Sequence, residues 1–159
     1  MSYQNWIFSL HLLTAATLVG GFVMSWIVVV ALRATKAPDA TLSLNRVANV
    51  ATVVVVIGLL GTIALGIWTA TLRPELHPWR GWAIAAIVLW AIAAAAVLRS
   101  FVEYAKPVAK AKELIASGLT GPNDELTALN RTSTGLLLRG LASAAIVLIV
   151  IDMIYKPGA

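Results

Sequence analysis

The chain has 159 residues, of which 60% are hydrophobic and 12% are charged, and its formal net charge is +5. A soluble domain carries about a quarter charged residues, so this composition excludes an ordinary soluble protein and favours a single integral membrane domain. The absence of cysteine excludes disulfides, thiolate metal ligands and cysteine nucleophiles.

Four apolar segments, residues 5–32, 47–72, 81–101 and 135–155, reach the length of about 20 residues that a membrane-crossing helix needs. Lipid offers no partner to open backbone groups, and the alanine-rich and leucine-rich composition of the segments indicates helices. Because the first two connections are short, neighbouring helices should run antiparallel. We therefore expect an all-α, four-helix up-down bundle over residues 1–159.

The first segment contains His11, which lies in a stretch with no Asp, Glu, Lys or Arg from Met1 to Leu32. Ionisable residues at membrane depth are costly and usually face the bundle interior, a cavity or a cofactor. Imidazole is also a ligand for metals and for haem iron. Two interpretations stay open: a histidine that hydrogen-bonds a neighbouring helix, or an axial haem ligand. Its helix face carries Thr14, Ala15, Leu18, Phe22 and Ser25.

The second segment carries a stripe of small residues, Gly58, Gly61, Thr62 and Gly66. Small residues allow close packing between membrane helices, which is the first interpretation. A face that docks another subunit or a cofactor is the alternative. At the start of this segment, Asn45, Arg46 and Asn49 are typical of helix capping and anchoring at the membrane surface.

The connection before the third segment contains His77 between two prolines. It is either a solvated turn residue or a weak second candidate for a haem ligand. Two histidines without a third ligand do not make a tight zinc site.

Six tryptophans suggest how deep the segments lie. Trp6, Trp79 and Trp82 fall near one boundary of the predicted spans, as in an interfacial aromatic belt. Trp26 and Trp90 lie deeper, and we expect them to pack between helices.

Residues 103–134 are predicted to form a cytoplasmic helical loop. Its first part should extend the third helix, with an interruption at Pro107, because proline lacks the N–H that a helix uses. Gly118 follows as a helix stop. Asn123 is a candidate N-cap for a short helix over residues 124–131.

The fourth segment contains Asp152, near the same boundary as His11. A carboxylate beside an imidazole fixes its tautomer, so Asp152 is a candidate second-shell partner of His11. The alternative is a local pair with Lys156, four residues later. Arg139, one turn inside this segment, should extend to the cytoplasmic surface.

The basic residues are divided unequally between the two sides of the predicted bundle. One side has only Arg73, Arg80 and Lys156. The other side has Arg33, Lys36, Arg46, Arg99, Lys106, Lys110, Lys112, Arg131 and Arg139. Cytoplasmic loops carry the excess of Lys and Arg, so both termini should lie outside the inner (cytoplasmic) membrane. This distribution also explains the positive charge without nucleic-acid binding.

Several short motifs resemble the small four-helix bacterial membrane proteins that include the copper-resistance D family, the haem J-type protoporphyrinogen oxidases and their uncharacterised relatives. The motifs are Leu10-His11-Leu12-Leu13, Val19-Gly20-Gly21, Asn45-Arg46, Gly58, Pro78-Trp79 and the closing Asp152-Met153-Ile154-Tyr155-Lys156-Pro157. The resemblance implies that His11 ligates haem b. The chain has Phe8 and Gly140-Leu141 where the haem-binding branch has a lysine and an Asn-Glu pair, so the resemblance is strongest to the uncharacterised relatives.

These observations give two hypotheses of function. The first is a membrane protein that binds haem b through His11 and is associated with electron transfer, with no other metal. The alternative is a non-catalytic accessory subunit that packs onto a larger respiratory or photosynthetic complex, with other membrane subunits or a second copy of the chain as partners. Whether the chain is an enzyme is left open.

Overall fold

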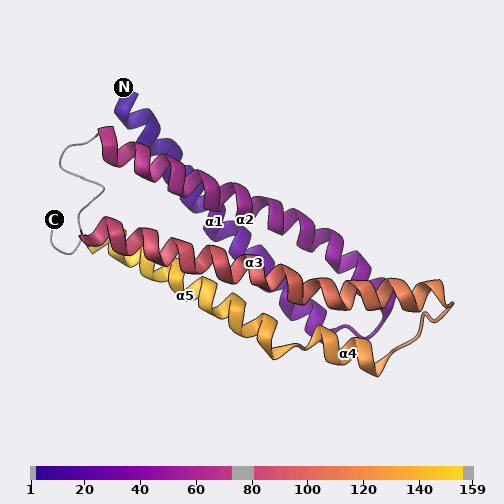
Figure 1. The fold of residues 1–159 in the computed structure, drawn as a ribbon. Helices are drawn as coiled ribbons and strands as arrows, with labels where there is room; N and C mark the ends of the chain where they lie inside the picture. The colour runs from indigo at the N-terminus through magenta and orange to yellow at the C-terminus, as the bar shows by residue number, and fades with distance from the viewer. Residues whose placement is uncertain (1–2, 73–80, 156–159) are drawn as a thin grey trace.

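A computed structural model describes residues 3–72 and 81–155 of the chain. These residues form α1 (Tyr3–Ala34), α2 (Pro38–Leu72), α3 (Gly81–Ala116), α4 (Asp124–Asn130) and α5 (Ser133–Tyr155), with no strand among them (Figure 1). The predicted all-α class is confirmed. Four stretches are long and apolar enough to cross a membrane: α1, α2, α3, and α4 together with α5.

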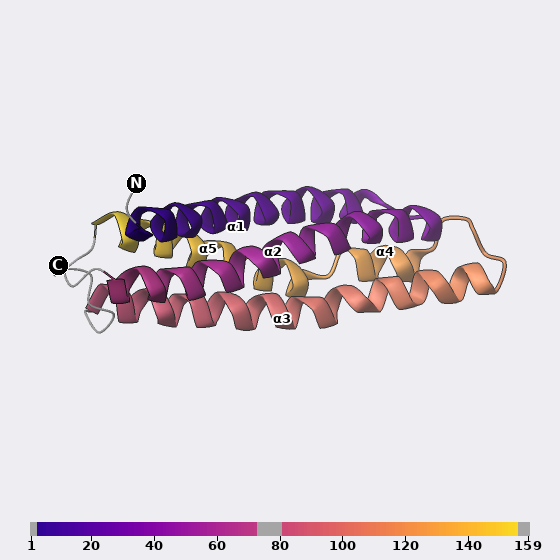
Figure 2. The same ribbon diagram turned by 90° about the horizontal axis from the view of Figure 1, so that it is seen from above.

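The long helices lie lengthwise beside one another in an elongated bundle (Figures 1 and 2). Two pairs make up the bundle, since α1 packs closely on α2 and α3 on α5. The first pair is joined to the second mainly where α2 meets α3. The beginning of α1 and the end of α5 lie at one end, and α4 lies at the other (Figure 1). We call these the terminal end and the α4 end.

Glycines bring α1 and α2 into close contact along a line that we call the glycine seam. A Cβ atom added to Gly58 would lie 2.6 Å from Leu18, and one added to Gly61 would lie 2.6 Å from Thr14. In the opposite sense, Val55 of α2 fills the space at Gly21 of α1. As residue numbers rise along α1 they fall along α2, so the two helices run antiparallel.

The main core joins the two pairs. Its buried members come from four helices: Leu18, Phe22, Val55, Leu59, Ala93, Ala96, Val97, Ala142, Ala145 and Ile146. Two tryptophans fasten it with hydrogen bonds. Trp26 Nε1 donates to Ser143 Oγ at 2.8 Å, and Trp90 Nε1 donates to the Leu59 carbonyl at 2.9 Å. The predicted packing role of Trp26 and Trp90 is confirmed.

The prediction of an interfacial aromatic belt is wrong for one of its three tryptophans. Trp82 is only 5% exposed, so it belongs to the interior of the bundle and does not present its ring to the surroundings. It is the second residue of α3. Trp6 is 58% exposed on α1, and Trp79 lies outside the described residues.

The α4 end largely follows the sequence prediction, with one correction at Pro107. There α3 is not interrupted and continues to Ala116, with the proline buried inside it. A proline within a helix removes one backbone hydrogen bond, but packing around the ring can retain the helix. Asn123 caps α4 as predicted, since its side-chain oxygen accepts from the Leu126 N–H at 2.9 Å.

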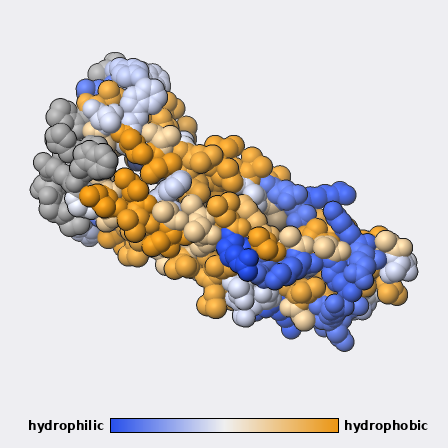
Figure 3. Space-filling model, viewed as in Figure 1, coloured by the Kyte–Doolittle hydropathy of each residue, from blue (hydrophilic) through white to orange (hydrophobic). Residues whose placement is uncertain are grey.

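The surface of the bundle divides into an apolar length and a polar end. Large apolar side chains are widely exposed along the helices; examples are Leu13, Ile27, Leu98 and Leu137, at 62%, 65%, 64% and 73% exposed. On the face in Figure 3, hydrophilic residues gather at the α4 end. A monomer in water rarely exposes so much contiguous apolar surface.

Candidate functional site

His11 lies in the glycine seam, where its imidazole covers Gly66 of α2. A Cβ atom at Gly66 would lie 3.1 Å from Cε1 of His11 and 3.4 Å from Nδ1, so glycine is what leaves room for the ring. One helical turn on, Thr14 occupies Gly61 in the same way. The small-residue stripe is therefore a packing surface inside the chain, as the first interpretation predicts.

The Nδ1 atom of His11 is buried without a hydrogen bond of good geometry within residues 3–72 and 81–155, while the imidazole interacts with the backbone carbonyl of Thr62 on α2. In the same described part, Thr62 Oγ1 and Asp152 Oδ2 are also buried without a partner. His11 and Asp152 are not joined by a hydrogen bond among these residues. Lys156, the alternative partner of Asp152, and His77 both lie outside the described residues.

The surroundings of His11 add little to its imidazole as a ligand set for a metal ion. Among the described residues, no three His, Cys, Asp or Glu side chains gather closely enough to hold a metal ion. His11 lines neither of the two cavities described below.

The larger cavity, which we call the inter-hairpin cavity, lies between the α1–α2 pair and the α3–α5 pair on the side of the α4 end. It encloses about 500 Å³, within the range of small-ligand sites. Its apolar walls include Val28, Val29 and Leu32 of α1 and Phe101 of α3.

One wall of the inter-hairpin cavity is a polar stripe on α2. Thr41, Asn45, Asn49 and Thr52 are spaced by three or four residues, which puts them on one helix face. The two asparagines thus face a cavity, whereas the sequence interpretation treated them as capping and anchoring residues. Their spacing of four residues is the sequence signal that places both on this face.

Arg139 of α5 faces the stripe from the opposite pair of helices. Its guanidinium lies over the ring of Tyr104, with the Cζ atom 5.1 Å from the ring centroid. The ring itself lies against Gly135, where an added Cβ would come within 3.1 Å of it. Arg139 Nε is buried and has no hydrogen-bond partner in the described part of the chain. Arg139 is thus held inside the bundle and does not simply extend to the surface as predicted.

A second, smaller hollow shares Ser25, Thr52, Phe101 and Arg139 with the inter-hairpin cavity. Its volume of about 20 Å³ is enough for one water molecule. Polar atoms therefore reach from the cavity towards the middle of the bundle.

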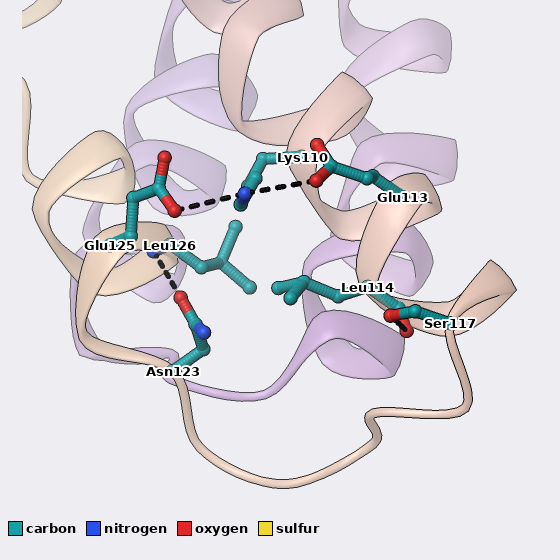
Figure 4. A network of polar contacts seen from close by, with 7 residues as sticks. All are labelled: Lys110, Glu113, Leu114, Ser117, Asn123, Glu125 and Leu126. Atoms are coloured by element: carbon teal, nitrogen blue, oxygen red, sulfur yellow. Dashed lines mark hydrogen bonds and ion pairs between the residues drawn. The ribbon is translucent and has the colours of Figure 1, made fainter.

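The α4 end is closed by a set of contacts that we call the clasp. Figure 4 shows Lys110 of α3 between two carboxylates, Glu113 at 3.2 Å and Glu125 of α4 at 2.9 Å. Beneath this pair, Leu126 is fully buried and its side chain points towards Leu114 (Figure 4).

The clasp also reaches the α1–α2 pair through polar contacts. Arg33 donates to the Arg131 carbonyl at 3.0 Å, and Arg131 Nε donates to the Arg33 carbonyl at 3.1 Å. The amide of Asn130 donates to Thr35 O and to Thr41 Oγ1. Through α4, the two helix pairs are therefore fastened together at this end.

Comparison with known proteins finds no relative of this chain. The chain matches no protein-family model, no curated protein and no solved structure. The resemblance drawn from the short motifs stays a prediction.

Proposed function

We propose that the chain is a multi-pass protein of the bacterial inner membrane, in which α1, α2, α3 and α5 cross the bilayer in an up-down bundle. The single observation that carries this proposal is the exposed apolar length of the bundle beside a polar, charged α4 end. Lipid would cover the apolar length. The α4 end carries the excess of Lys and Arg, so it would face the cytoplasm, with both termini outside.

Single cysteines test this topology cleanly, because the natural chain has none. Ser117→Cys marks the α4 end and Gln4→Cys marks the terminal end; both positions are exposed. We expect a membrane-impermeant maleimide to label Gln4→Cys in cells whose inner membrane is intact. Ser117→Cys should react only after that membrane is permeabilised. The reverse pattern would contradict the orientation, and equal labelling of both in intact cells would contradict membrane crossing.

Within this membrane protein we propose His11 as an axial ligand of haem b, with a role in electron transfer. Its support is the resemblance described above, together with the fixed seat of the imidazole on Gly66. The residues present suit one axial ligand, and the haem itself would supply the change of oxidation state. The chain would hold the iron through the imidazole and keep the ring oriented by packing it on Gly66.

An absorption spectrum of the full chain purified in detergent tests the haem proposal. The matched variants are His11→Ala and His77→Ala, since these are the only two histidines. We expect a Soret band in the wild type that is lost in His11→Ala and kept in His77→Ala. Loss in both variants would instead assign His77 as a second ligand. No band in the wild type, or a band unchanged in His11→Ala, would overturn the proposal.

The accessory-subunit role stays an alternative proposal, but its docking face has to change. Gly21, Gly58, Gly61 and Gly66 are already filled by side chains of the α1–α2 pair. Gly20 has open space around it and lies on the exposed side of α1. Migration of the chain alone after mild detergent extraction would speak against a subunit, whereas co-migration that Gly20→Trp abolishes would support one.

A further inference from the structure

The inter-hairpin cavity has cations on its walls and no carboxylate. Lys112 and Arg139 line it, and no Asp or Glu is among its lining residues. Three glutamates near this end are engaged elsewhere: Glu103 pairs with Arg99 at 3.4 Å and Lys106 at 2.7 Å, and Glu113 and Glu125 bind Lys110. Asp39 and Asp124 lie at this end too, but neither lines the cavity. The lining therefore carries positive charge only.

Arg139 makes that charge hard to explain by folding alone. Within the described residues it forms no ion pair; its guanidinium hydrogen-bonds the Tyr104 side chain, but its buried Nε lacks a hydrogen-bond partner. A guanidinium that is partly removed from water without an anion is costly, because it gives up hydration for little in return. The cation–π contact with the Tyr104 ring recovers part of this free-energy cost and orients the guanidinium group. A bound oxyanion would satisfy the remaining donors.

The α2 wall of the cavity offers further donors. Asn45 and Asn49 lie one turn apart on α2 in the same lining. The Tyr104 hydroxyl is already engaged, since it hydrogen-bonds the Arg139 guanidinium. Arginine fits phosphate bidentately, and amides complete the coordination of its remaining oxygens. A carboxylate has only two oxygens and would use fewer of these donors.

The size of the inter-hairpin cavity and its apolar part add a second property to the ligand. About 500 Å³ exceeds what a bare phosphate fills, and Val28, Val29, Leu32 and Phe101 would lie against carbon. The cavity is also on the side of the bundle that carries the basic residues. Basic pockets between membrane helices on the cytoplasmic side bind the headgroups of anionic lipids.

We propose that the inter-hairpin cavity is a binding site for a phosphate-bearing anion, with Arg139 as the main contact and Lys112, Asn45 and Asn49 around it. Two sources supply this chemistry: the headgroup of an anionic phospholipid, and a free phosphate. The site is separate from His11, so it stands or falls independently of the haem proposal.

Thermal unfolding of the delipidated full chain in detergent tests the site with three probes: phosphatidylglycerol, phosphatidylcholine and inorganic phosphate. Ligands that bind only the folded state raise the unfolding midpoint. A rise with phosphatidylglycerol alone assigns the lipid headgroup, and a rise with inorganic phosphate assigns the free anion. No rise with either, or equal rises with the two lipids, overturns the proposal.

The variant Arg139→Gln decides whether the response belongs to this cavity. We expect its half-maximal concentration to rise about ten-fold or more, the value of a lost charge-assisted hydrogen bond. Arg46→Gln is the matched control, since Arg46 is an exposed arginine of α2 outside the lining, and it should respond as the wild type. An unchanged response of Arg139→Gln overturns the proposal. Should that variant not fold, Asn49→Leu takes its place with the same two outcomes.

Discussion

Gly58 is the position where α1 and α2 come closest, and it limits what the glycine seam tolerates. A Cβ there would lie 2.6 Å from both Cα and N of Leu18, which are backbone atoms that cannot rotate away. The helices would have to separate along their whole contact. Whether a side chain fits at Gly58 therefore depends on the distance between the two helix backbones, and rearranging side chains cannot make room for it.

We predict that Gly58→Ala lowers the free energy of unfolding by about 1–3 kcal/mol, because the added methyl overpacks the seam. Circular dichroism during thermal unfolding in detergent measures the change. Gly20→Ala is the control: nothing lies within 4 Å of its added Cβ, so it should be neutral or slightly stabilising. Equal stability of the two variants would show that α1 and α2 do not pack through Gly58.

The sequence showed which residues of α1 share a face with His11, but not what that face touches. Spacing alone placed Thr14 and Leu18 beside His11, and the structure seats all three on glycines of α2. Neither periodicity nor composition says which of three other helices supplies the partner surface. For the same reason Trp82 was misplaced, because a residue near a helix end can face lipid or a neighbour with the same local sequence.

At the scale of elements, the short helix α4 depends on its burial more than on its own length. Seven residues are too few for an isolated helix in water. The Asn123 cap and two acidic residues in the first turn favour it locally, and Leu126 fixes it against α3. The sequence predicted this element well because capping is a local signal.

Leu126→Ala is predicted to cost about 2–5 kcal/mol of local stability, since Leu126 is fully buried beside Ala111 and Leu114. Hydrogen exchange over residues 117–132 would become faster, while exchange in the middle of the four long helices stays unchanged. The matched control is Leu119→Ala, whose side chain is 58% exposed. If both variants exchange like the wild type, α4 is not anchored through Leu126.

Asn123→Ala should destabilise α4 by about 1 kcal/mol, because the Leu126 N–H loses its acceptor. The same exchange experiment reads out the change at residues 124–130. Asn123→Asp serves as the control, since aspartate caps helices equally well. A loss in Asn123→Asp as large as in Asn123→Ala would mean that the side-chain oxygen is not what stabilises the helix.

At the scale of the whole molecule, the bundle combines a tight contact and a loose one. The α1–α2 pair closes on glycines, whereas the two pairs leave about 500 Å³ between them near the α4 end. Sequence could not reveal this hollow, because its walls come from four helices and its volume depends on how the pairs are set apart. Asn45, Asn49 and Arg139 line it, but in the sequence each of them has a separate local explanation as a capping, anchoring or surface residue.

Substitutions at two alanines of α2 can distinguish the open inter-hairpin cavity from tightly packed parts of the bundle. We predict that Ala48→Leu, which adds carbon to the inter-hairpin cavity, leaves the unfolding midpoint unchanged or raises it. Ala51→Leu, three residues away at a position that is 0% exposed, should lower stability by about 1–3 kcal/mol. Thermal unfolding of the two purified variants compares them directly. A larger loss in Ala48→Leu than in Ala51→Leu would mean that the cavity is not open.

The clasp has a consequence for how the chain is made. Arg33 bonds to a carbonyl 98 positions later, and Asn130 bonds to Thr35 across 95 positions. During translation, α1 and α2 are made well before Asn130 and Arg131. Until those residues are made, the polar groups at this end of the α1–α2 pair lack these partners. During that interval the glycine seam must hold α1 and α2 together on its own. The polar contacts at this end can form only once α4 and Arg131 have been made.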